Sequence, residues 1–367
     1  MSHTYQPLLS SYQLGDLELK NRVIMASLTR ARATNSYLAP TPLMATYYAQ
    51  RASAGLIISE STWISPKAIG YVHIPGIYTQ AQVEGWKLVT HAVHANGGKI
   101  FLQLAHIGSA SHPDFFDGDI PRGASAINPQ IPAYTPEGFK ESVTPVAFTK
   151  EEIKETIEDY RKAAANAKAA GFDGVELHAQ LYALIPQFLS AATNQRTDEY
   201  GGSIENRARL LFEILDALKQ VWDSKRIGVK FTPTAFNPGI LQPDEHTIPT
   251  FQYIIDKLNE YDLGYLHWVG PAVDLTGTVI EQMQDNYFRQ VRDSYKGTLM
   301  ANRGFTNETA NKIIQDNHAD LVSFGIDFIA NPDLVIRLAS NLPLAKPDTA
   351  TFYTGEEKGY SDYPTSN

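Results

Sequence analysis

The sequence contains no cysteine, and none of its apolar runs approaches the length needed to cross a bilayer. A chain without cysteine has no disulfide, no thiolate catalysis and no Cys-ligated metal or iron–sulfur site. The first residues show no basic region followed by an apolar run, so we expect no secretory signal. These absences fit a reducing compartment. We expect a cytoplasmic protein with no membrane partner.

Basic charge is scarce as well. Lys and Arg number 31 against 40 Asp and Glu, which gives a net charge of -9. An acidic surface argues against nucleic acid or an anionic membrane as the main partner. A metal-ligand set is not evident either, because His91 and His94 stand three residues apart on a predicted helix without an evident third ligand. We therefore expect no metal site.

The sequence does carry enough apolar residues, 43% of 367, for a large core. Eight short apolar, β-rich runs alternate with helical segments, and several show little polar–apolar alternation, as strands covered on both faces do. Eight βα repeats predict an α/β fold, a TIM-type (β/α)8 barrel. The expected strands are 22–27, 55–61, 99–106, 174–179, 227–233, 264–269, 298–302 and 321–325, and the clearest helices are 150–170, 203–222, 306–315 and 331–339.

A doubly wound sheet is the competing fold. It would usually carry a glycine-rich phosphate turn after its first strand, whereas residues 26–30 read Ala-Ser-Leu-Thr-Arg. We therefore prefer one barrel domain over residues 1–345. Residues 112–145 are too long for an ordinary βα connection and predict a lid-like insertion after the third strand. The polar tail 346–367 predicts an extended arm or a frayed end.

In such a barrel the side chains at the carboxyl ends of the strands form the active site. Gln103 can hydrogen-bond the edge of a planar heterocycle, Lys230 can place positive charge beside it, and His178 can donate to a carbonyl oxygen or act as acid or base. Each residue alone is more often a packing or capping residue. Their shared placement on one rim favours a functional role. The rim selected in this way is Thr29, Ser61, Gln103, His106, His178, Lys230, His267 and Asn302.

Residues 194–207 read NQRTDEYGGSIENR. This segment resembles the signature of the Old Yellow Enzyme family, the flavin-dependent ene-reductases. Three further stretches resemble the same family, at residues 21–30, at 57–60 with 70–76, and at 324–334. The resemblance covers about residues 7–342 and implies an FMN site, reduction of the flavin by NADPH or NADH, and hydride delivery to the β-carbon of an α,β-unsaturated carbonyl compound.

The resemblance also implies roles for single residues. The Thr29 hydroxyl is expected to approach a flavin carbonyl, and Gln103 to contact the pyrimidine edge. We predict as cofactor-binding residues Ser27, Thr29, Ser61, Gln103, Lys230, Asn302, Arg303, Gly304 and Gly325, and as substrate residues Tyr71, Ala105, Leu181, Ala183 and Trp268.

The substrate side departs from the family pattern. After the fourth strand the family has His-x-x-Asn or His-x-x-His, which grips the carbonyl oxygen, and two residues later a tyrosine that supplies the proton. His178 is retained, but Leu181 and Ala183 replace the second donor and the tyrosine. Tyr182 stands one residue away, and only an irregular loop would bring it into the site. We predict His178 and Tyr182 as the catalytic residues. Ala105 stands where a tryptophan is common, which would widen the substrate side.

The cofactor side departs as well. Lys230 replaces an arginine expected beside the flavin, and Ile326 replaces an arginine expected in the phosphate pocket. Arg303 lies in a turn where the family has small residues. It either replaces the missing phosphate charge or fills the phosphate pocket.

Two hypotheses follow. The first is an FMN-dependent NAD(P)H oxidoreductase for a small conjugated carbonyl compound, working as a monomer or homodimer. The alternative is a non-redox isomerase or cyclase for a conjugated carbonyl in natural-product biosynthesis (secondary metabolism), with weakened or lost FMN binding, which the substitutions favour. A silent binding protein is disfavoured because the rim keeps His178, Lys230 and Gln103. We keep the redox hypothesis first.

Overall fold

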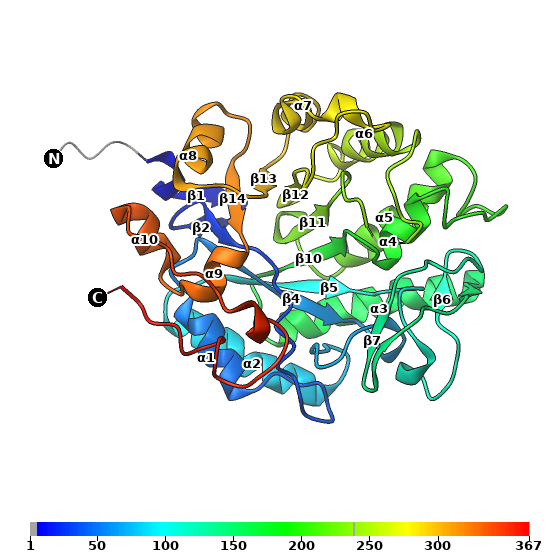
Figure 1. Ribbon diagram of the computed structural model, residues 1–367, viewed down its shortest axis with the longest axis horizontal. Coiled ribbons are helices and arrows are strands. Elements are labelled where there is room, and N and C mark those ends of the chain that lie inside the picture. The colour runs from blue at the N-terminus through cyan, green and yellow to red at the C-terminus, as the bar shows by residue number, and fades with distance from the viewer. Residues whose placement is uncertain (1–5, 238, 367) are drawn as a thin grey trace.

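The computed structural model describes residues 6–237 and 239–366 and shows a closed barrel of eight parallel strands. Around the barrel the strands run in the order β10-β11-β12-β13-β14-β3-β4-β5, and helices form the outer layer (Figure 1). The predicted barrel and its eight strands are therefore confirmed. The strands are β3 (Val23–Met25), β4 (Leu56–Trp63), β5 (Ile100–Ala105), β10 (Gly174–Ala179), β11 (Ile227–Phe231), β12 (Tyr265–Val269), β13 (Leu299–Asn302) and β14 (Leu321–Phe324).

Along the chain, helices alternate with the strands of the barrel. The predicted helix at 331–339 begins later, at Leu334. No helix of the described residues is long and apolar enough to span a membrane. The helices are α1 (Pro42–Gln50), α2 (Gln80–Ala95), α3 (Lys150–Ala169), α4 (Leu184–Leu189), α5 (Ile204–Lys219), α6 (Thr247–Leu258), α7 (Tyr287–Ser294), α8 (Asn307–Gln315), α9 (Ile326–Ala330) and α10 (Leu334–Ser340).

The period-two alternation of strands divides the core into two clusters. Outward-facing residues such as Val175, Val229 and Trp268 belong to the large cluster between strands and helices. Inward-facing Phe101 and Tyr265 belong to a second cluster that fills the floor of the barrel, together with the hairpin β1 (Tyr12–Leu14) and β2 (Leu17–Leu19). Towards the carboxyl ends of the strands the inward-facing residues become polar, so we expect a functional site at this end of the barrel.

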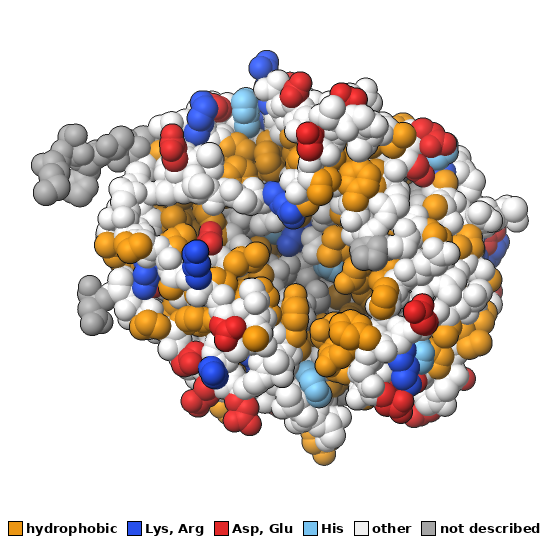
Figure 2. All heavy atoms as spheres, in the orientation of Figure 1, with side chains coloured by type: hydrophobic (Ala, Val, Ile, Leu, Met, Phe, Trp, Pro, Cys, Tyr) orange, Lys and Arg blue, Asp and Glu red, His pale blue; other side chains and the backbone are white. Residues whose placement is uncertain are grey.

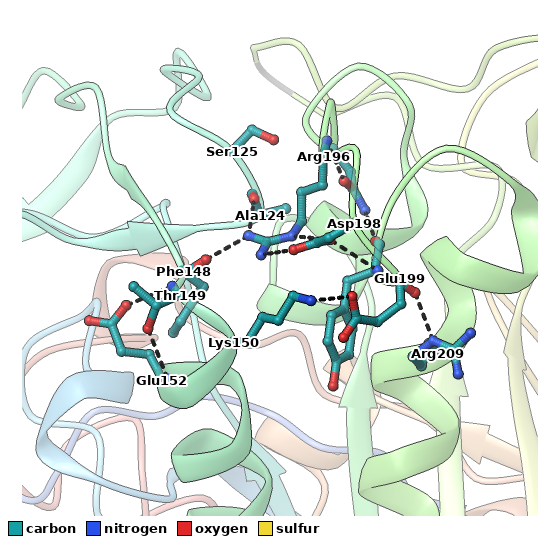
Figure 3. Close-up of polar contacts among 12 residues, drawn as sticks. Ala124, Ser125, Phe148, Thr149, Lys150, Glu152, Arg196, Asp198, Glu199 and Arg209 are labelled. Atoms are coloured by element: carbon teal, nitrogen blue, oxygen red, sulfur yellow. Dashed lines mark hydrogen bonds and ion pairs between the residues drawn. The ribbon is translucent and has the colours of Figure 1, made fainter.

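The family-like segment 194–207 ties the connection between β5 and α3 to the barrel (Figure 3). Arg196 donates to the carbonyls of Ala124 (3.0 Å) and Phe148 (2.7 Å) and holds both carboxylate oxygens of Asp198. The Gln195 amide donates to Ser125 Oγ at 2.9 Å. The segment thus acts structurally, by fixing a connection that carries the small strands β6 (Arg122–Gly123), β7 (Ala133–Thr135), β8 (Gly138–Lys140) and β9 (Val146–Ala147). The lid role of residues 112–145 stays a prediction.

The carboxyl-terminal tail is an ordered arm rather than a frayed end. It runs beside α1 and α9 (Figure 1). Arg30 donates to the carbonyls of Phe352 (3.0 Å) and Gly359 (2.7 Å), and Arg32 donates to the Thr351 carbonyl (2.8 Å). The ring of the fully buried Tyr360 stacks on Tyr47 with centroids 4.1 Å apart. These contacts hold the tail against the barrel.

Candidate active site

The polar ends of the strands gather at the carboxyl end of the barrel. The face of the molecule shown in Figure 2 is hollowed near its middle, and basic and hydrophobic side chains border the hollow. The register of the strands explains the gathering, because Ser61 pairs with Gln103, and His178 pairs with Lys230 across neighbouring strands. The structure thus places these four residues at the carboxyl ends of neighbouring strands, and their roles stay predictions.

Gln103 is the central residue of this rim. Its Nε2 donates to Glu176 Oε1 at 2.7 Å and to Ser27 Oγ at 2.8 Å, while its Oε1 accepts from Ser61 Oγ at 2.8 Å. Lys230 Nζ donates to the same Ser27 Oγ at 3.0 Å. Four side chains from four strands or strand ends thus form one hydrogen-bonded edge, in which Gln103 is fully buried and Ser27 and Ser61 are partly exposed.

A second chain of hydrogen bonds runs below this edge through the barrel interior. Glu176 Oε2 lies 2.8 Å from His267 Nδ1, and His267 Nε2 lies 2.8 Å from Ser323 Oγ. Asn302 Nδ2 donates to Ser323 Oγ at 2.7 Å. Burial, with the Lys230 charge, lowers the pKa of His267 to about 4, so its ring is neutral at pH 7. The neutral ring then donates from Nδ1 to the carboxylate and accepts at Nε2 from the serine hydroxyl.

His178 is the polar group best placed to act on a bound molecule. It is 8% exposed, and its Nδ1 has no hydrogen-bond partner within the described chain. Burial, assisted by the Lys230 charge, lowers its pKa to about 4. A neutral, nearly buried imidazole with an unsatisfied ring nitrogen can donate to a carbonyl oxygen from the nitrogen that carries the proton.

Three predicted residues lie elsewhere than expected. His106 folds back on its own loop, where its Nδ1 accepts from the Gly108 amide at 2.9 Å. His267 lies one layer below the rim and is fully buried. Trp268, predicted as a substrate residue, packs against Phe231 and Phe251 in the layer between barrel and helices, with centroids 6.0 and 5.5 Å away. That prediction was wrong because Trp268 follows the inward-facing His267 and so must point outward.

Tyrosines from distant segments meet on the substrate side. The ring of Tyr71, which follows β4, lies 5.1 Å from Tyr134 of the β5–α3 connection and 6.0 Å from Tyr353 of the tail. Burial, then the neighbouring phenols of Tyr353, Tyr134 and Tyr182, raises the pKa of Tyr71 to about 12. Burial and Tyr353 likewise raise the pKa of Tyr182. Tyr182 therefore lies near this group of phenols.

The two substituted family positions differ in environment. Ala183 is fully buried as the residue before α4. Leu181 is 36% exposed and adopts a left-handed backbone with φ 54°. Neither side chain can donate a hydrogen bond. Ala105, on the neighbouring strand β5, is buried as well. Leu181 lines a cavity together with Pro186 and Thr232, so the structure does not place its side chain against His178.

The predicted phosphate side lies at the ends of β13 and β14. Arg303 is exposed and adopts φ 130°, a backbone region that glycine reaches readily and arginine rarely. It follows Asn302 and precedes Gly304, around whose missing Cβ there is open space. No ion pair of Arg303 is found among the residues that the structure describes. Across from it, Gly325 precedes Ile326, whose side chain is 60% exposed.

The family model described as NADH:flavin oxidoreductase / NADH oxidase matches residues 7–345. The chain belongs to this family, the Old Yellow Enzyme family. It is 40% identical to 12-oxophytodienoate reductase 1 of Oryza sativa subsp. japonica over 365 residues, covering 98% of this chain and 93% of that protein. It is 39% identical to a probable flavin mononucleotide-dependent alkene reductase of Leishmania infantum, covering 99% and 98%. A solved structure of morphinone reductase in complex with tetrahydroNAD superposes with a TM-score of 0.91, with 44% identity over 98% of both chains.

The residues present fit the FMN expected of an Old Yellow Enzyme. The pyrimidine ring offers both hydrogen-bond donors and acceptors, and the edge formed by Ser27, Gln103 and Lys230 is complementary to such a ring. Thr29 follows the strand β3 at the same end of the barrel. On the phosphate side, Arg303 is exposed beside Gly304, around whose missing Cβ there is open space, and its charge suits a phosphate.

Two residues of this site were missed by the sequence analysis. Glu176 stands two residues before His178 on β10, so the strand period could have placed both on the inward face. Tyr353 lies in a tail without periodicity, and no local pattern predicts its long-range contact with Tyr71.

The buried histidines make stability depend on pH. The pKa is lowered to about 3 for His106, chiefly by burial, and to about 4 for His178 and His267. The unfolded chain binds these protons near pH 6.5 and the folded chain does not, so this contribution to stability is present above pH 6.5 and is lost as pH falls towards 4. Glu60, whose pKa burial raises to about 7, opposes the trend, as do Asp159 and Asp327, whose pKa values burial also raises.

We therefore expect the melting temperature to fall as pH is lowered from 6.5 to 4.5. Each buried histidine contributes up to about 1.4 kcal/mol per pH unit. Thermal unfolding of His106→Asn at several pH values should show a shallower slope than the parent. The exposed His91 supplies the matched control, and an equal slope in His91→Asn and His106→Asn would contradict the assignment.

Proposed function

We propose that this protein is an FMN-dependent ene-reductase that uses NADPH or NADH to reduce an α,β-unsaturated carbonyl compound. The observation that carries the proposal is the pairing of a heterocycle-binding edge, at Gln103 and Lys230, with the neutral, nearly buried His178. The relatives support it, because they are named as reductases and as an FMN-dependent alkene reductase. When bound, FMN supplies the hydride that it has taken from the nicotinamide.

On the cofactor side, the chain orients the ring and stabilises its reduced form. Gln103 and Ser27 would hold the pyrimidine edge, and the Lys230 ammonium beside Ser27 would stabilise the negative charge of the reduced ring. Burial lowers the pKa of Lys230, while Glu176 opposes that effect. A lysine acts here as a point charge, unlike the forked guanidinium that it replaces.

On the substrate side, His178 donates to the carbonyl oxygen and so polarises the conjugated double bond for attack at the β-carbon. Ala183 can supply no proton to the α-carbon. Tyr182 is the proposed proton source, because it belongs to the group of phenols with Tyr71 and Tyr353, although burial raises its pKa and so weakens it as an acid. Tyr71, Ala105 and Leu181 form the walls against which the substrate lies.

On the phosphate side, Arg303 supplies the charge that Ile326 cannot. The guanidinium is exposed next to Gly304, and no carboxylate of the described chain neutralises it. Of the two roles left open by the sequence, replacement of the missing charge is favoured over filling of the pocket. A charge-assisted contact of this kind contributes about 1.5–3 kcal/mol.

The non-redox isomerase or cyclase is the less favoured candidate. The relatives do not favour it, and the edge at Gln103 and Lys230 is intact despite the substitutions.

The test is the colour of the protein. Purified protein, or protein mixed with FMN, is expected to absorb as a bound flavin and to bleach anaerobically on addition of NADPH or NADH. Reoxidation by 2-cyclohexen-1-one then completes the cycle. Colourless protein that fails to bind added FMN would refute the redox proposal and favour the alternative. A protein that binds FMN and is not reoxidised by any enone would refute the ene-reductase assignment alone.

A further inference from the structure

Glu176 is a fully buried carboxylate with no assigned role in the reaction. It projects from β10 into the barrel, one layer below His178. Both of its oxygens are held, Oε1 by Gln103 Nε2 at 2.7 Å and Oε2 by His267 Nδ1 at 2.8 Å. A carboxylate fixed in this way in the interior needs a compensating positive charge, because an unpaired buried charge is strongly destabilising.

The compensating charge is the Lys230 ammonium. The two groups do not touch but are joined through two side chains, from Lys230 Nζ to Ser27 Oγ at 3.0 Å, from Ser27 Oγ to Gln103 Nε2 at 2.8 Å, and on to Glu176. Glu176 is the one opposite charge found to act on Lys230 within the described chain, and the Glu176 pKa is lowered because His267, Lys230 and Gln103 together outweigh its burial. Glu176 is thus kept ionised first by His267 and then by Lys230, and Glu176 in turn favours the charged form of Lys230.

The carboxylate also decides which way each hydrogen bond runs. An ionised carboxylate only accepts, so the Gln103 amide must turn its Nε2 inward. Both Nε2 hydrogens are then used, on Glu176 and Ser27, and Oε1 keeps a lone pair beyond the one bonded to Ser61. Ser27 Oγ accepts from Gln103 and Lys230. Its own hydroxyl proton is left to point out of the network, towards the site.

We propose that Glu176 is a positioning residue that keeps Lys230 protonated and fixes the donor and acceptor pattern of the cofactor edge, and that it thereby sets the reduction potential of the bound flavin. The inference rests on the proposed function, since it concerns the FMN of that site. Its physical basis is the exchange of arginine for lysine. A guanidinium stays charged in any protein environment, but a buried ammonium loses its proton unless a counter-charge holds it.

The test replaces Glu176 with Gln, which removes the charge and keeps the shape. Lys230 is then expected to lose its proton at neutral pH, so the anionic reduced flavin loses its stabilising charge. The equilibrium should shift about tenfold towards oxidised flavin, which is about 30 mV downward for a two-electron couple. The dissociation constant of FMN is expected to rise about tenfold. Without the carboxylate, the Gln103 side-chain amide can flip and exchange the places of its Nε2 and Oε1.

The matched variant is Glu176→Gln combined with Lys230→Arg. An arginine keeps its charge without the carboxylate, so this double variant should recover the potential of the parent or exceed it, while Lys230→Arg alone serves as reference. A merely structural role for Glu176 predicts no such recovery. An unchanged potential in E176Q, or a drop that the added K230R does not reverse, would overturn the inference.

If E176Q does not fold, the double variant Glu176→Gln with Lys230→Met tests the pairing of the two charges instead. Removing both charges should give a protein with a higher melting temperature than either single variant, and a melting temperature no higher than theirs would contradict the pairing. Failure of the inference is distinct from failure of the proposed function. A parent protein that binds no FMN contradicts the function, whereas a parent that binds FMN with a potential indifferent to Glu176 contradicts the inference alone.

Discussion

Replacing His178 with Ala is expected to lower kcat/KM for an enone by about 10²–10³-fold, because the site has no second donor for the carbonyl oxygen. Where the family has two hydrogen-bond donors, this chain has His178 and Leu181. The imidazole of His178 alone therefore polarises the substrate carbonyl. The effect should appear in reoxidation of the reduced flavin by the enone, measured anaerobically by rapid mixing. FMN affinity should change little, because His178 does not belong to the Gln103–Lys230 edge.

Leu181 offers the converse variant. Its φ of 54° is a conformation that asparagine adopts more easily than leucine. Leu181→Asn therefore places a second donor at this position without straining the backbone, and kcat/KM is expected to rise by about 5–150-fold, from a contact of about 1–3 kcal/mol. In the His178→Ala background it should restore part of the lost rate. A His178→Ala variant within threefold of the parent would remove His178 from the mechanism.

The sequence predicted the barrel and most of the rim because both depend on short-range periodicity. Side chains two residues apart in a strand lie on the same face of the sheet. This rule correctly places Gln103, His178 and Lys230 on the inward face of the barrel. The same rule, applied strictly, would have rejected Trp268 and found Glu176. The depth of a residue within the barrel is harder to predict, since it depends on register between strands. His267 consequently lies one layer below the position expected of it.

The contacts of the tail were beyond prediction for a different reason. Tyr353 reaches Tyr71, and Tyr360 stacks on Tyr47, across sequence separations that leave no local pattern. The carbonyls that Arg30 and Arg32 bind are present in every residue, so nothing in the sequence marks them. The tail nevertheless adds a phenol to the substrate side. Local patterns therefore predict the scaffold better than they predict the walls of the site.

Replacing Arg303 with Gly is expected to change stability and FMN affinity in opposite directions. At φ 130° glycine relieves a strained backbone, which stabilises the apoprotein by about 1–2 kcal/mol. Loss of the guanidinium weakens FMN by about 10–150-fold, which corresponds to about 1.5–3 kcal/mol. Thermal unfolding of the apoprotein and quenching of FMN fluorescence measure the two effects separately. If Arg303 merely filled the pocket, FMN would bind more tightly to the variant, not less.

Ile326→Arg supplies the matched test. Its side chain is 60% exposed at the start of α9, so an arginine fits there without displacing the core. In the Arg303→Gly background this change should return most of the FMN affinity, because the positive charge reaches the phosphate from the neighbouring strand end. The recovered affinity should weaken with rising salt, as the affinity of the parent is expected to do. A double variant that binds FMN no better than Arg303→Gly would show that the charge at 303 and the arginine expected at 326 do not serve the same phosphate.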